Sequence, residues 1–234
     1  MSTEHKKPNS AARIVVSEDG PYEVMGNVPL SKMTIATDAE GGSEKWEQGK
    51  VYPPQESYSL CRCGHSKTKP FCDASHLKVH FDGSETASRE AYMDQAEAME
   101  GPGHALTDVQ GLCAFARYCD PNGQVWAQVK HTGNPEVREQ FLRQVGNCPS
   151  GRLVAWDKKT QKPIEPELPV SIALIEDPAQ GCSGPLWIRG GIQIESADGF
   201  QYEVRNRVTL CRCGQSQNKP FCDGTHAAVK FRDE

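Results

Sequence analysis

The sequence predicts an α+β protein built from small antiparallel β modules, and three observations support this class. The stretches GPYEVMGNVPL from Gly20 and GPLWIRGGIQI from Gly184 alternate apolar residues around a central glycine, which is typical of a strand, a turn and a second strand. The residue pattern of the stretch PEVREQFLRQVGN is typical of a helix. The 234 residues include 21 glycines and 16 prolines, so we expect many turns and a modest core.

The two Gly-Pro stretches belong to a longer internal repeat. The segments YPPQESYSL from Tyr52 and YEVRNRVTL from Tyr202 align position for position, and each leads directly into a cysteine-rich string. The copies are 164 residues apart at Gly-Pro but 150 apart at the cysteines, so the first copy holds about 14 additional residues. We place these in the stretch TDAEGGSEKWEQGK and expect a surface loop there. Two homologous modules therefore flank a different central segment.

This repeat sets the expected domain organisation. The connector after the first module is expected to hold a short helix from Ser88 to Met99, stopped by Gly101-Pro102-Gly103. The predicted units are an N-terminal module at 1–86, a connector at 87–103, a central domain at 104–166 and a C-terminal module at 167–234.

Charge and hydropathy restrict the expected partners. A net charge of −5 argues against nucleic acid or an anionic membrane as the main partner, because both attract cationic surfaces. No apolar run approaches the ~20 residues of a membrane span. The N-terminal stretch MSTEHKKPNSAARIVV has no hydrophobic core of the signal-peptide kind. We therefore expect a soluble, cytoplasmic protein with no membrane partner.

Ten cysteines in such a protein indicate metal or redox chemistry, because disulfides are rare in reducing compartments. The strings CRCGHSKTKPFCDASH at 61–76 and CRCGQSQNKPFCDGTH at 211–226 share one spacing of three cysteines and a histidine. Each string offers four ligands, namely Cys61, Cys63, Cys72 and His76 in the first and Cys211, Cys213, Cys222 and His226 in the second.

The end of each string is expected to open a short helix. Cys222 and His226 are four residues apart, which brings them to one helical face. Asp73 and Asp223 follow the third cysteine of each string, near the helix start, where a carboxylate can accept backbone N–H bonds. The spacing alone is also compatible with a closed structural zinc site of three thiolates and one imidazole.

Both strings resemble the CDGSH iron-sulfur domain, which is the motif of mitoNEET-type proteins. Thr225 replaces the serine of the motif in the second copy, and Ala74 replaces its glycine in the first. The resemblance implies a 2Fe-2S cluster in each set of four ligands. Proteins of this type form intertwined dimers, so the duplication implies an intramolecular pseudo-dimer, with the chain a monomer or a homodimer.

The central segment carries a third group of cysteines. CAFARYC at 113–119 and CPSG at 148–151 resemble a divergent single-cluster ferredoxin domain over residues 104–156, with Ala116 at the middle cysteine position. The resemblance implies a 3Fe-4S or a 4Fe-4S cluster on three thiolates, which are those of Cys113, Cys119 and Cys148. A fourth ligand would be water, His104, His131 or Cys182, and Cys182 is otherwise a lone buried thiol.

Two functions are open at this point. Three one-electron centres predict an electron-transfer protein, whose partners would be redox proteins. The titratable histidine ligand alternatively predicts an iron-sulfur cluster carrier or a redox sensor, whose partners would be cluster-accepting apo-proteins. The sequence contains no nucleotide-binding glycine loop and no nucleophile with a base, so we do not expect an enzyme.

Overall fold

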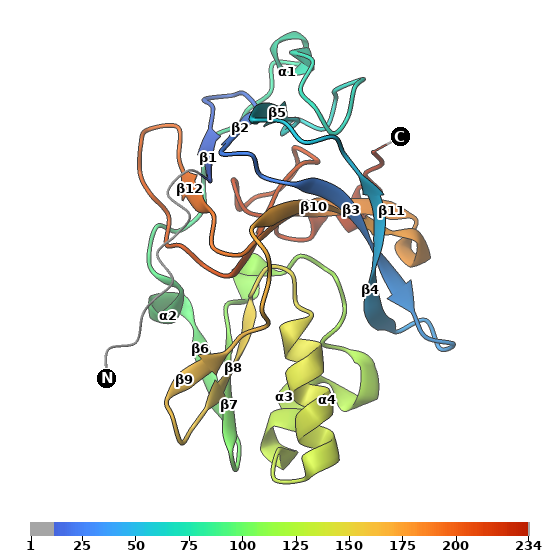
Figure 1. The fold of residues 1–234 in the computed structure, drawn as a ribbon, viewed down its shortest axis with the longest axis vertical. Helices are drawn as coiled ribbons and strands as arrows, with labels where there is room; N and C mark the ends of the chain where they lie inside the picture. Colours follow the sequence, from blue (N-terminus) through green and yellow to red (C-terminus); the bar gives the residue numbers. More distant parts are fainter. Residues whose placement is uncertain (1–11, 234) are drawn as a thin grey trace.

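The computed structural model describes residues 12–233 as a mixed α/β structure with three small sheets and short helices (Figure 1). The segment used above to argue against a signal peptide lies mostly in residues 1–11, outside the described residues. Among residues 12–233, no helix combines the length and the apolar character that crossing a membrane would require.

The first two sheets are formed by the two homologous modules. The first sheet has the order β12-β1-β2-β5, made of β12 (Gln193–Glu195), β1 (Arg13–Val16), β2 (Tyr22–Met25) and β5 (Ser57–Leu60). The second has the order β13-β11-β10-β3-β4, made of β13 (Arg207–Leu210), β11 (Cys182–Arg189), β10 (Ser171–Asp177), β3 (Leu30–Thr37) and β4 (Ser43–Val51).

The modules exchange strands between these two sheets. The Gly-Pro stretches do form a strand, a turn and a second strand, as predicted, but the second strand leaves its own sheet. Strand β3 of the N-terminal copy pairs with β10, and β12 of the C-terminal copy pairs with β1. Both pairings are parallel, so the prediction of purely antiparallel modules was wrong at one place in each sheet. Each module therefore completes the sheet of the other.

One hydrophobic core lies between the two sheets. It includes Ile14, Tyr22 and Leu60 from the first sheet together with Ile172 and Leu186 from the second, all of them less than 2% exposed. Burial of one such aliphatic side chain contributes roughly 1.5–3 kcal/mol. Neither module retains this core without the other, so we expect the two modules to fold together.

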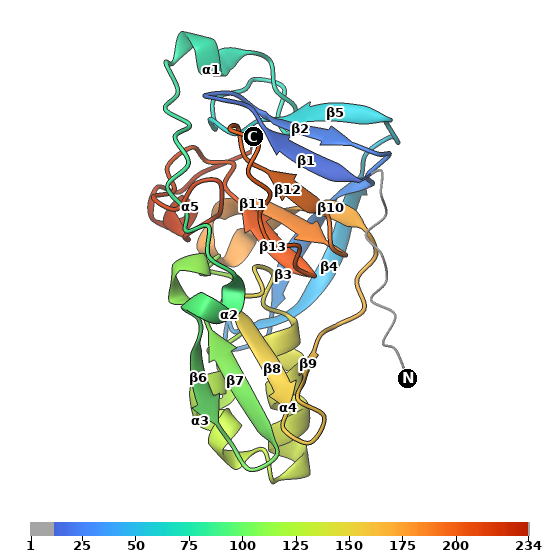
Figure 2. The same cartoon turned by 90° about the vertical axis from the view of Figure 1, so that its left-hand side faces the viewer.

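The third sheet belongs to the central segment and lies at the lower end of the molecule in Figures 1 and 2. Its order is β6 (Glu97–Glu100), β7 (His104–Asp108), β8 (Leu153–Asp157) and β9 (Lys162–Ile164). The helices α3 (Val125–Gln128) and α4 (Pro135–Gly146) cover it. The Asn134 side chain caps α4 by accepting from Glu136 N, which begins the helix predicted for this stretch.

The remaining helices are short. Three α-helical turns are α1 (Ser75–Lys78), α2 (Tyr92–Gln95) and α5 (Thr225–Ala228), and the 3₁₀ turns are η1 (Gln110–Leu112), η2 (Pro121–Gly123), η3 (Val129–His131) and η4 (Pro178–Gln180). The predicted helix at 88–99 is reduced to α2. Residues 97–100 form β6 instead, because they pair with β7 across a turn that contains Gly101-Pro102-Gly103.

The additional residues of the first copy also differ from expectation. The stretch TDAEGGSEKWEQGK forms most of β4, which pairs antiparallel with β3, rather than a surface loop. Trp46 in β4 stacks against Tyr118 and Trp187, with ring centroids 4.9 and 4.7 Å apart. The insertion therefore joins the N-terminal module to the central domain, because Tyr118 lies between two of the central cysteines.

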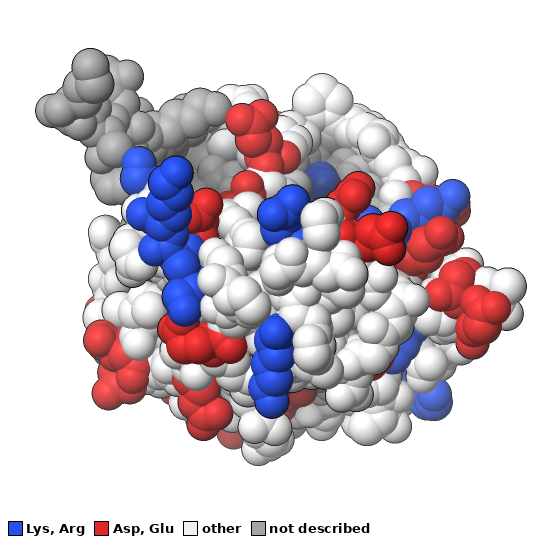
Figure 3. All heavy atoms as spheres, turned by 90° about the horizontal axis from the view of Figure 1, so that it is seen from below, with Lys and Arg blue, Asp and Glu red and all other residues white. Residues whose placement is uncertain are grey.

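The surface at the lower end of the molecule carries both signs of charge. Figure 3 views this end, where Lys and Arg side chains alternate with Asp and Glu side chains over a largely uncharged background. The described part of this face shows both signs of charge intermixed. The expectation that nucleic acid is not a partner stays a prediction, as do the domain boundaries at 86, 103 and 166.

Candidate metal centres

The two repeated strings fold in the same way from their strands. Strand β5 leads into Cys61, whose N–H donates to Pro70 O at 2.8 Å, while Cys72 N donates to Ser59 O at 2.9 Å. These bonds return the third cysteine beside the first. The same two bonds recur in the second string at 2.9 Å each, between Cys211 and Pro220 and between Cys222 and Thr209.

The eight predicted ligands are brought together in four pairs. In the N-terminal site, Cys61 Sγ and Cys63 Sγ are 3.8 Å apart, and Cys72 Sγ is 3.4 Å from His76 Nδ1. In the C-terminal site, the corresponding distances are 3.7 Å between Cys211 and Cys213 and 3.4 Å between Cys222 and His226. The predicted helices α1 and α5 carry the two histidines.

These separations can be compared with what one metal requires. Two thiolates bound to a tetrahedral metal at ~2.3 Å lie about 3.8 Å apart, and a thiolate and an imidazole lie about 3.5 Å apart. Each pair therefore has the spacing of two ligands on one metal. Among the described residues, no group of three or more His, Cys, Asp or Glu side chains could hold a single metal ion.

Hydrogen bonding prepares the thiol pairs for metal binding. The bond with Cys63 lowers the pKa of Cys61 to about 6, and the bond with Cys213 lowers the pKa of Cys211 to about 6. The same bonds and burial raise the pKa of Cys63 and Cys213, because each pair shares one proton. The hydrogen bond therefore favours the thiolate form of one cysteine in each pair, and the thiolate is the metal-binding form.

Asp73 and Asp223 hold the loops and do not approach the ligand pairs as ligands. Asp73 accepts from Ser75 N and Lys67 N, both at 2.9 Å, which lowers its pKa. Asp223 accepts from Thr225 N at 3.0 Å and Gln217 N at 2.8 Å. Burial raises the pKa of Asp223, but these bonds outweigh burial and lower it overall. The bond to the first helical residue is the contact predicted from the sequence.

The two sites touch each other through their glycines. Gly64 and Gly214 follow the second cysteine of each string, with φ of +80° and +79°. A Cβ on Gly64 would lie 2.6 Å from Cys213 O, and a Cβ on Gly214 would lie 2.5 Å from Cys63 O. The contact is therefore reciprocal, and only glycine fits both its backbone conformation and its close approach.

The three central cysteines line one pocket. Cys113, Cys119 and Cys148 all contribute to it, and so does Ala116, at the middle cysteine position of the ferredoxin-like string. The loop takes left-handed conformations at Phe115 (φ 54°) and Arg117 (φ 60°). Among the described residues, the backbone N–H groups of 114–119 have no hydrogen-bond acceptor in the protein. Left-handed residues and N–H groups without a protein acceptor are features of loops that bind anions, and an iron-sulfur cluster with its sulfides is such an anion.

A fixed cation lies at the same pocket. Arg152 lines it and is held by Asp108, with Nε–Oδ1 and Nη2–Oδ2 distances of 2.6 and 2.8 Å. Trp126 Nε1 donates to the same carboxylate at 2.9 Å. The arrangement fixes a guanidinium at the pocket, and its charge is balanced by the carboxylate of Asp108.

The alternative fourth ligands lie elsewhere. His104, His131 and Cys182 are not among the described residues that line the central pocket. Cys182 is 1% exposed at the start of β11, where it pairs with Asp177, and burial raises the pKa of its thiol. The structure thus brings three cysteines to the pocket, and among the described residues no further Cys or His lines it near Ala116.

Sequence reasoning did not predict that the two arginines between the paired cysteines are buried. Arg62 and Arg212, between the first two cysteines of each string, are 1% and 3% exposed rather than solvated. Arg212 Nε donates to Gly184 O at 2.6 Å, and Arg62 donates to Ser17 O at 3.2 Å. Their signal was weak, because a lone arginine in a loop is usually solvated. Only its repetition between paired cysteines distinguishes it.

Comparison with family models gave two matches. Residues 19–77 and 183–227 match a family described as an iron-binding zinc finger of the CDGSH type, and residues 99–158 match one described as a divergent 4Fe-4S mono-cluster. Comparison with curated proteins and with solved structures gave no match. The chain is therefore an iron-sulfur protein in which two CDGSH-type iron-binding regions flank a divergent 4Fe-4S mono-cluster region.

Proposed function

We propose that the protein transfers electrons through three iron-sulfur clusters held in one chain, two of the 2Fe-2S type and one 3Fe-4S or 4Fe-4S cluster. The observation that carries this proposal is that the three sites contact one another in series. The N-terminal and C-terminal sites meet at Gly64 and Gly214. A Cβ on Gly224 in the C-terminal site would lie 3.2 Å from Cys113 O of the central site. Clusters of these types take up and release single electrons.

The paired ligands support 2Fe-2S clusters over zinc. A structural zinc ion requires all four ligands of a site around one centre. The described residues of each site instead form two pairs with the spacing of one metal per pair. Cys61 and Cys63 would hold one iron and Cys72 and His76 the other, and the C-terminal site would divide in the same way.

The central site supports a cluster with one iron that lacks a protein thiolate. Three cysteines, Ala116 and Arg152 line the pocket, and the backbone N–H groups of 114–119 have no acceptor within residues 12–233. A 3Fe-4S cluster requires no fourth ligand, whereas a 4Fe-4S cluster would complete its fourth iron with water. We keep both alternatives, because the residues present fit either.

We further propose that the two modules form an intramolecular pseudo-dimer. The reciprocal strand exchange supports this arrangement, since β3 and β12 each join the sheet of the other module. The reciprocal glycine contact supports it as well. In this arrangement the chain is a monomer with internal pseudo-two-fold symmetry, and the central domain lies at one end.

The histidine ligands would make the 2Fe-2S sites sensitive to pH. Burial, and after it the charge of Arg212, lower the pKa of His226 to about 4. An unfolded imidazole titrates near pH 6.5, so the unfolded chain binds the proton first as the pH falls. Stability contributed by the neutral ring is therefore present above about pH 6.5 and is lost as the pH falls toward about 4. The neutral ring is also the form that binds metal.

We expect His226→Cys to lower the reduction potential of the C-terminal cluster by on the order of 100 mV or more, because an anionic thiolate replaces a neutral imidazole. The same variant should slow acid-induced cluster loss at that site. Redox titration followed by EPR, and visible absorbance during acidification, measure the two effects. His76→Cys should act in the same way on the N-terminal cluster.

The control is His131→Cys, which introduces a thiol at an exposed position outside all three sites. It should change neither the potentials nor the acid sensitivity. If His226→Cys and His76→Cys behave like this control, His226 and His76 are not the ligands and the proposed pH sensitivity fails.

The second candidate function is that of a cluster carrier or redox sensor. The half-buried state of Cys72 and His76 favours it, because a carrier must expose the cluster that it gives up. Redox proteins or cluster-accepting apo-proteins would be the partners in the two cases, and we propose a cytoplasmic, non-enzymatic role for both.

A further inference from the structure

The two CDGSH-type sites have nearly the same sequence, and their first two cysteines are buried alike, but their second ligand pairs differ in burial. Cys222 and His226 are 3% and 4% exposed, whereas Cys72 and His76 are only half-buried. Helix α5 packs against β11 and buries His226 and Ala227, while α1 buries none of its four residues. The difference must come from what surrounds each string, because the ligand spacing is the same.

The central domain covers the C-terminal site. A Cβ on Gly224 would lie 3.2 Å from Cys113 O and 3.3 Å from Phe115 Cβ, so the loop that carries Cys222 is in tight contact with the central loop. Asn218 Nδ2 donates to Gly111 O at 2.9 Å on the other side of the same contact. The N-terminal site has Ala74 at the position of Gly224, and Ala74 is exposed.

The N-terminal module holds the same loop. Thr86 donates from N to Lys219 O and from Oγ1 to Gln217 O, both at 2.8 Å. The Tyr22 hydroxyl bonds Cys211 O at 2.8 Å and Pro220 O at 3.0 Å. Leu186, which corresponds to Tyr22 in the repeat, has no hydroxyl to offer the N-terminal site in return.

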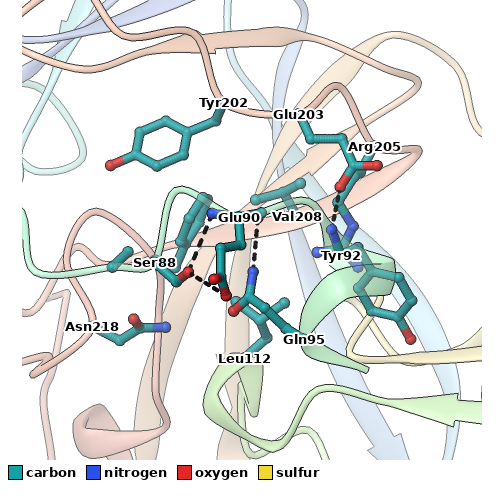
Figure 4. A pocket seen from close by; sticks show the side chains of 12 residues that line it. Ser88, Glu90, Tyr92, Gln95, Leu112, Tyr202, Glu203, Arg205, Val208 and Asn218 are labelled. Carbon is teal, nitrogen blue, oxygen red and sulfur yellow. Dashed lines mark hydrogen bonds between the residues drawn. The ribbon is translucent and has the colours of Figure 1, made fainter. Parts of the chain in front are cut away.

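Three parts of the chain also meet beside the C-terminal site. Figure 4 shows the pocket where the connector, the central domain and the C-terminal module meet, with Ser88, Leu112 and Asn218 on its walls. Tyr92 N donates to Glu203 Oε2 at 2.6 Å across it. The C-terminal tail adds further cover, since Ser183 N donates to Phe231 O at 2.7 Å.

The N-terminal site faces outward. Figures 1 and 2 place α1 at the upper end of the molecule, opposite the central domain. Leu77 and Val79, beside His76, are 69% and 42% exposed, and Lys67 and Lys78 are exposed as well. Within residues 12–233, and apart from the contact at Gly64, this site lacks the cover that the central domain and the tail give its counterpart.

We propose that the two CDGSH-type sites have different tasks: the N-terminal site exchanges its cluster with an apo-protein acceptor, and the C-terminal site retains its cluster as the internal link to the central site. In the exchange, Cys61, Cys63, Cys72 and His76 release two irons and two sulfides together. Thiolates of the acceptor bind them instead, and no electron is gained or lost. This inference rests on the proposal that both sites hold 2Fe-2S clusters.

The first test follows cluster loss from the full-length protein at pH 8 in excess EDTA. Iron and sulfide are first measured per chain, so that a protein without clusters overturns the proposed function and not the difference between sites. Loss of the 2Fe-2S absorbance should occur in two phases of equal amplitude whose rates differ at least 10-fold. Cys222→Ser should leave only the fast phase and Cys72→Ser only the slow phase. A single phase, or the reverse assignment, would overturn the inference.

The second test requires no cluster. In the cluster-free full-length protein, iodoacetamide should modify Cys72 at least 10-fold faster than Cys222, as read by peptide mass spectrometry. Gly224→Ala should accelerate modification of Cys222, because its Cβ pushes against Cys113 O, and the matched Ala74→Gly should leave Cys72 unchanged. Equal rates at Cys72 and Cys222 would show that the surrounding segments do not restrict access to Cys222, and would contradict the inference.

Discussion

Replacing Arg207 by Met is expected to lower the free energy of unfolding by about 3–5 kcal/mol, the usual cost of breaking a buried ion pair on one side. The Arg207 side chain is 0% exposed, and its Nε is 2.7 Å from Glu165 Oε2. It also donates to four backbone carbonyls of the central domain, which are those of Val145, Gly146, Cys148 and Leu153, at 2.7–3.1 Å. Without the guanidinium, all four carbonyls lose a donor, and among the described residues only Val145 O and Cys148 O keep another backbone bond, from Cys148 N at 3.1 Å and from Gly151 N at 3.3 Å.

The loss of stability in Arg207→Met should affect binding of the central cluster more than binding of the two 2Fe-2S clusters. Arg207 lies in β13 of the C-terminal module, yet it holds the loop that carries Cys148. The EPR signal of the central cluster should therefore weaken relative to the 2Fe-2S signals in Arg207→Met. The control is Arg138→Met on the exposed face of α4, which should change the free energy of unfolding by less than about 0.5 kcal/mol. Equal urea unfolding curves for the two variants would contradict the role given to Arg207.

Gly64→Ala and Gly214→Ala are expected to cost about 2–4 kcal/mol each, from strain in a left-handed backbone and from a clash. The new Cβ would lie 2.6 Å or less from a backbone carbonyl oxygen, which cannot rotate away as a side chain would. Because each glycine contacts the other module, either variant should loosen both CDGSH-type sites. Thermal unfolding and the 2Fe-2S absorbance measure the effect.

Gly199→Ala is the control that distinguishes the cost of the steric clash from the cost of backbone strain. Gly199 has φ +86°, but a Cβ there meets nothing within 4 Å. Its substitution should cost only about 1 kcal/mol. If Gly64→Ala costs no more than Gly199→Ala, the two sites are not in the close contact that the proposed series of clusters requires.

The sequence predicted the local structure of the sites well. Ligand spacing, the short helices that carry His76 and His226, and helix α4 follow from patterns within about 20 residues, where chain geometry restricts the outcome. The contact from Asp223 to the helix start is of the same kind. Such features depend on neighbours in the sequence, so a single chain is enough to predict them.

The sequence did not predict which distant segments pair or contact one another. The alternation of apolar residues in β3 and β12 predicts strands, but it does not say which sheet they join. Residues 97–100 became a strand because β7 offers a free edge to pair with. The partners of Arg207 were also hidden, since they are backbone carbonyls of another domain. Burial of the C-terminal site likewise depends on contact with the loop of Cys113, more than 100 residues earlier.

The most direct test of the proposed function is iron and acid-labile sulfide per chain, together with EPR of the anaerobically purified protein before and after dithionite. Two 2Fe-2S clusters and one 3Fe-4S or 4Fe-4S cluster require about seven or eight irons with eight sulfides, and reduction should produce 2Fe-2S signals. An oxidised three-iron signal would identify the central cluster as 3Fe-4S. Stoichiometric zinc without sulfide would contradict electron transfer and leave a protein with structural metal sites.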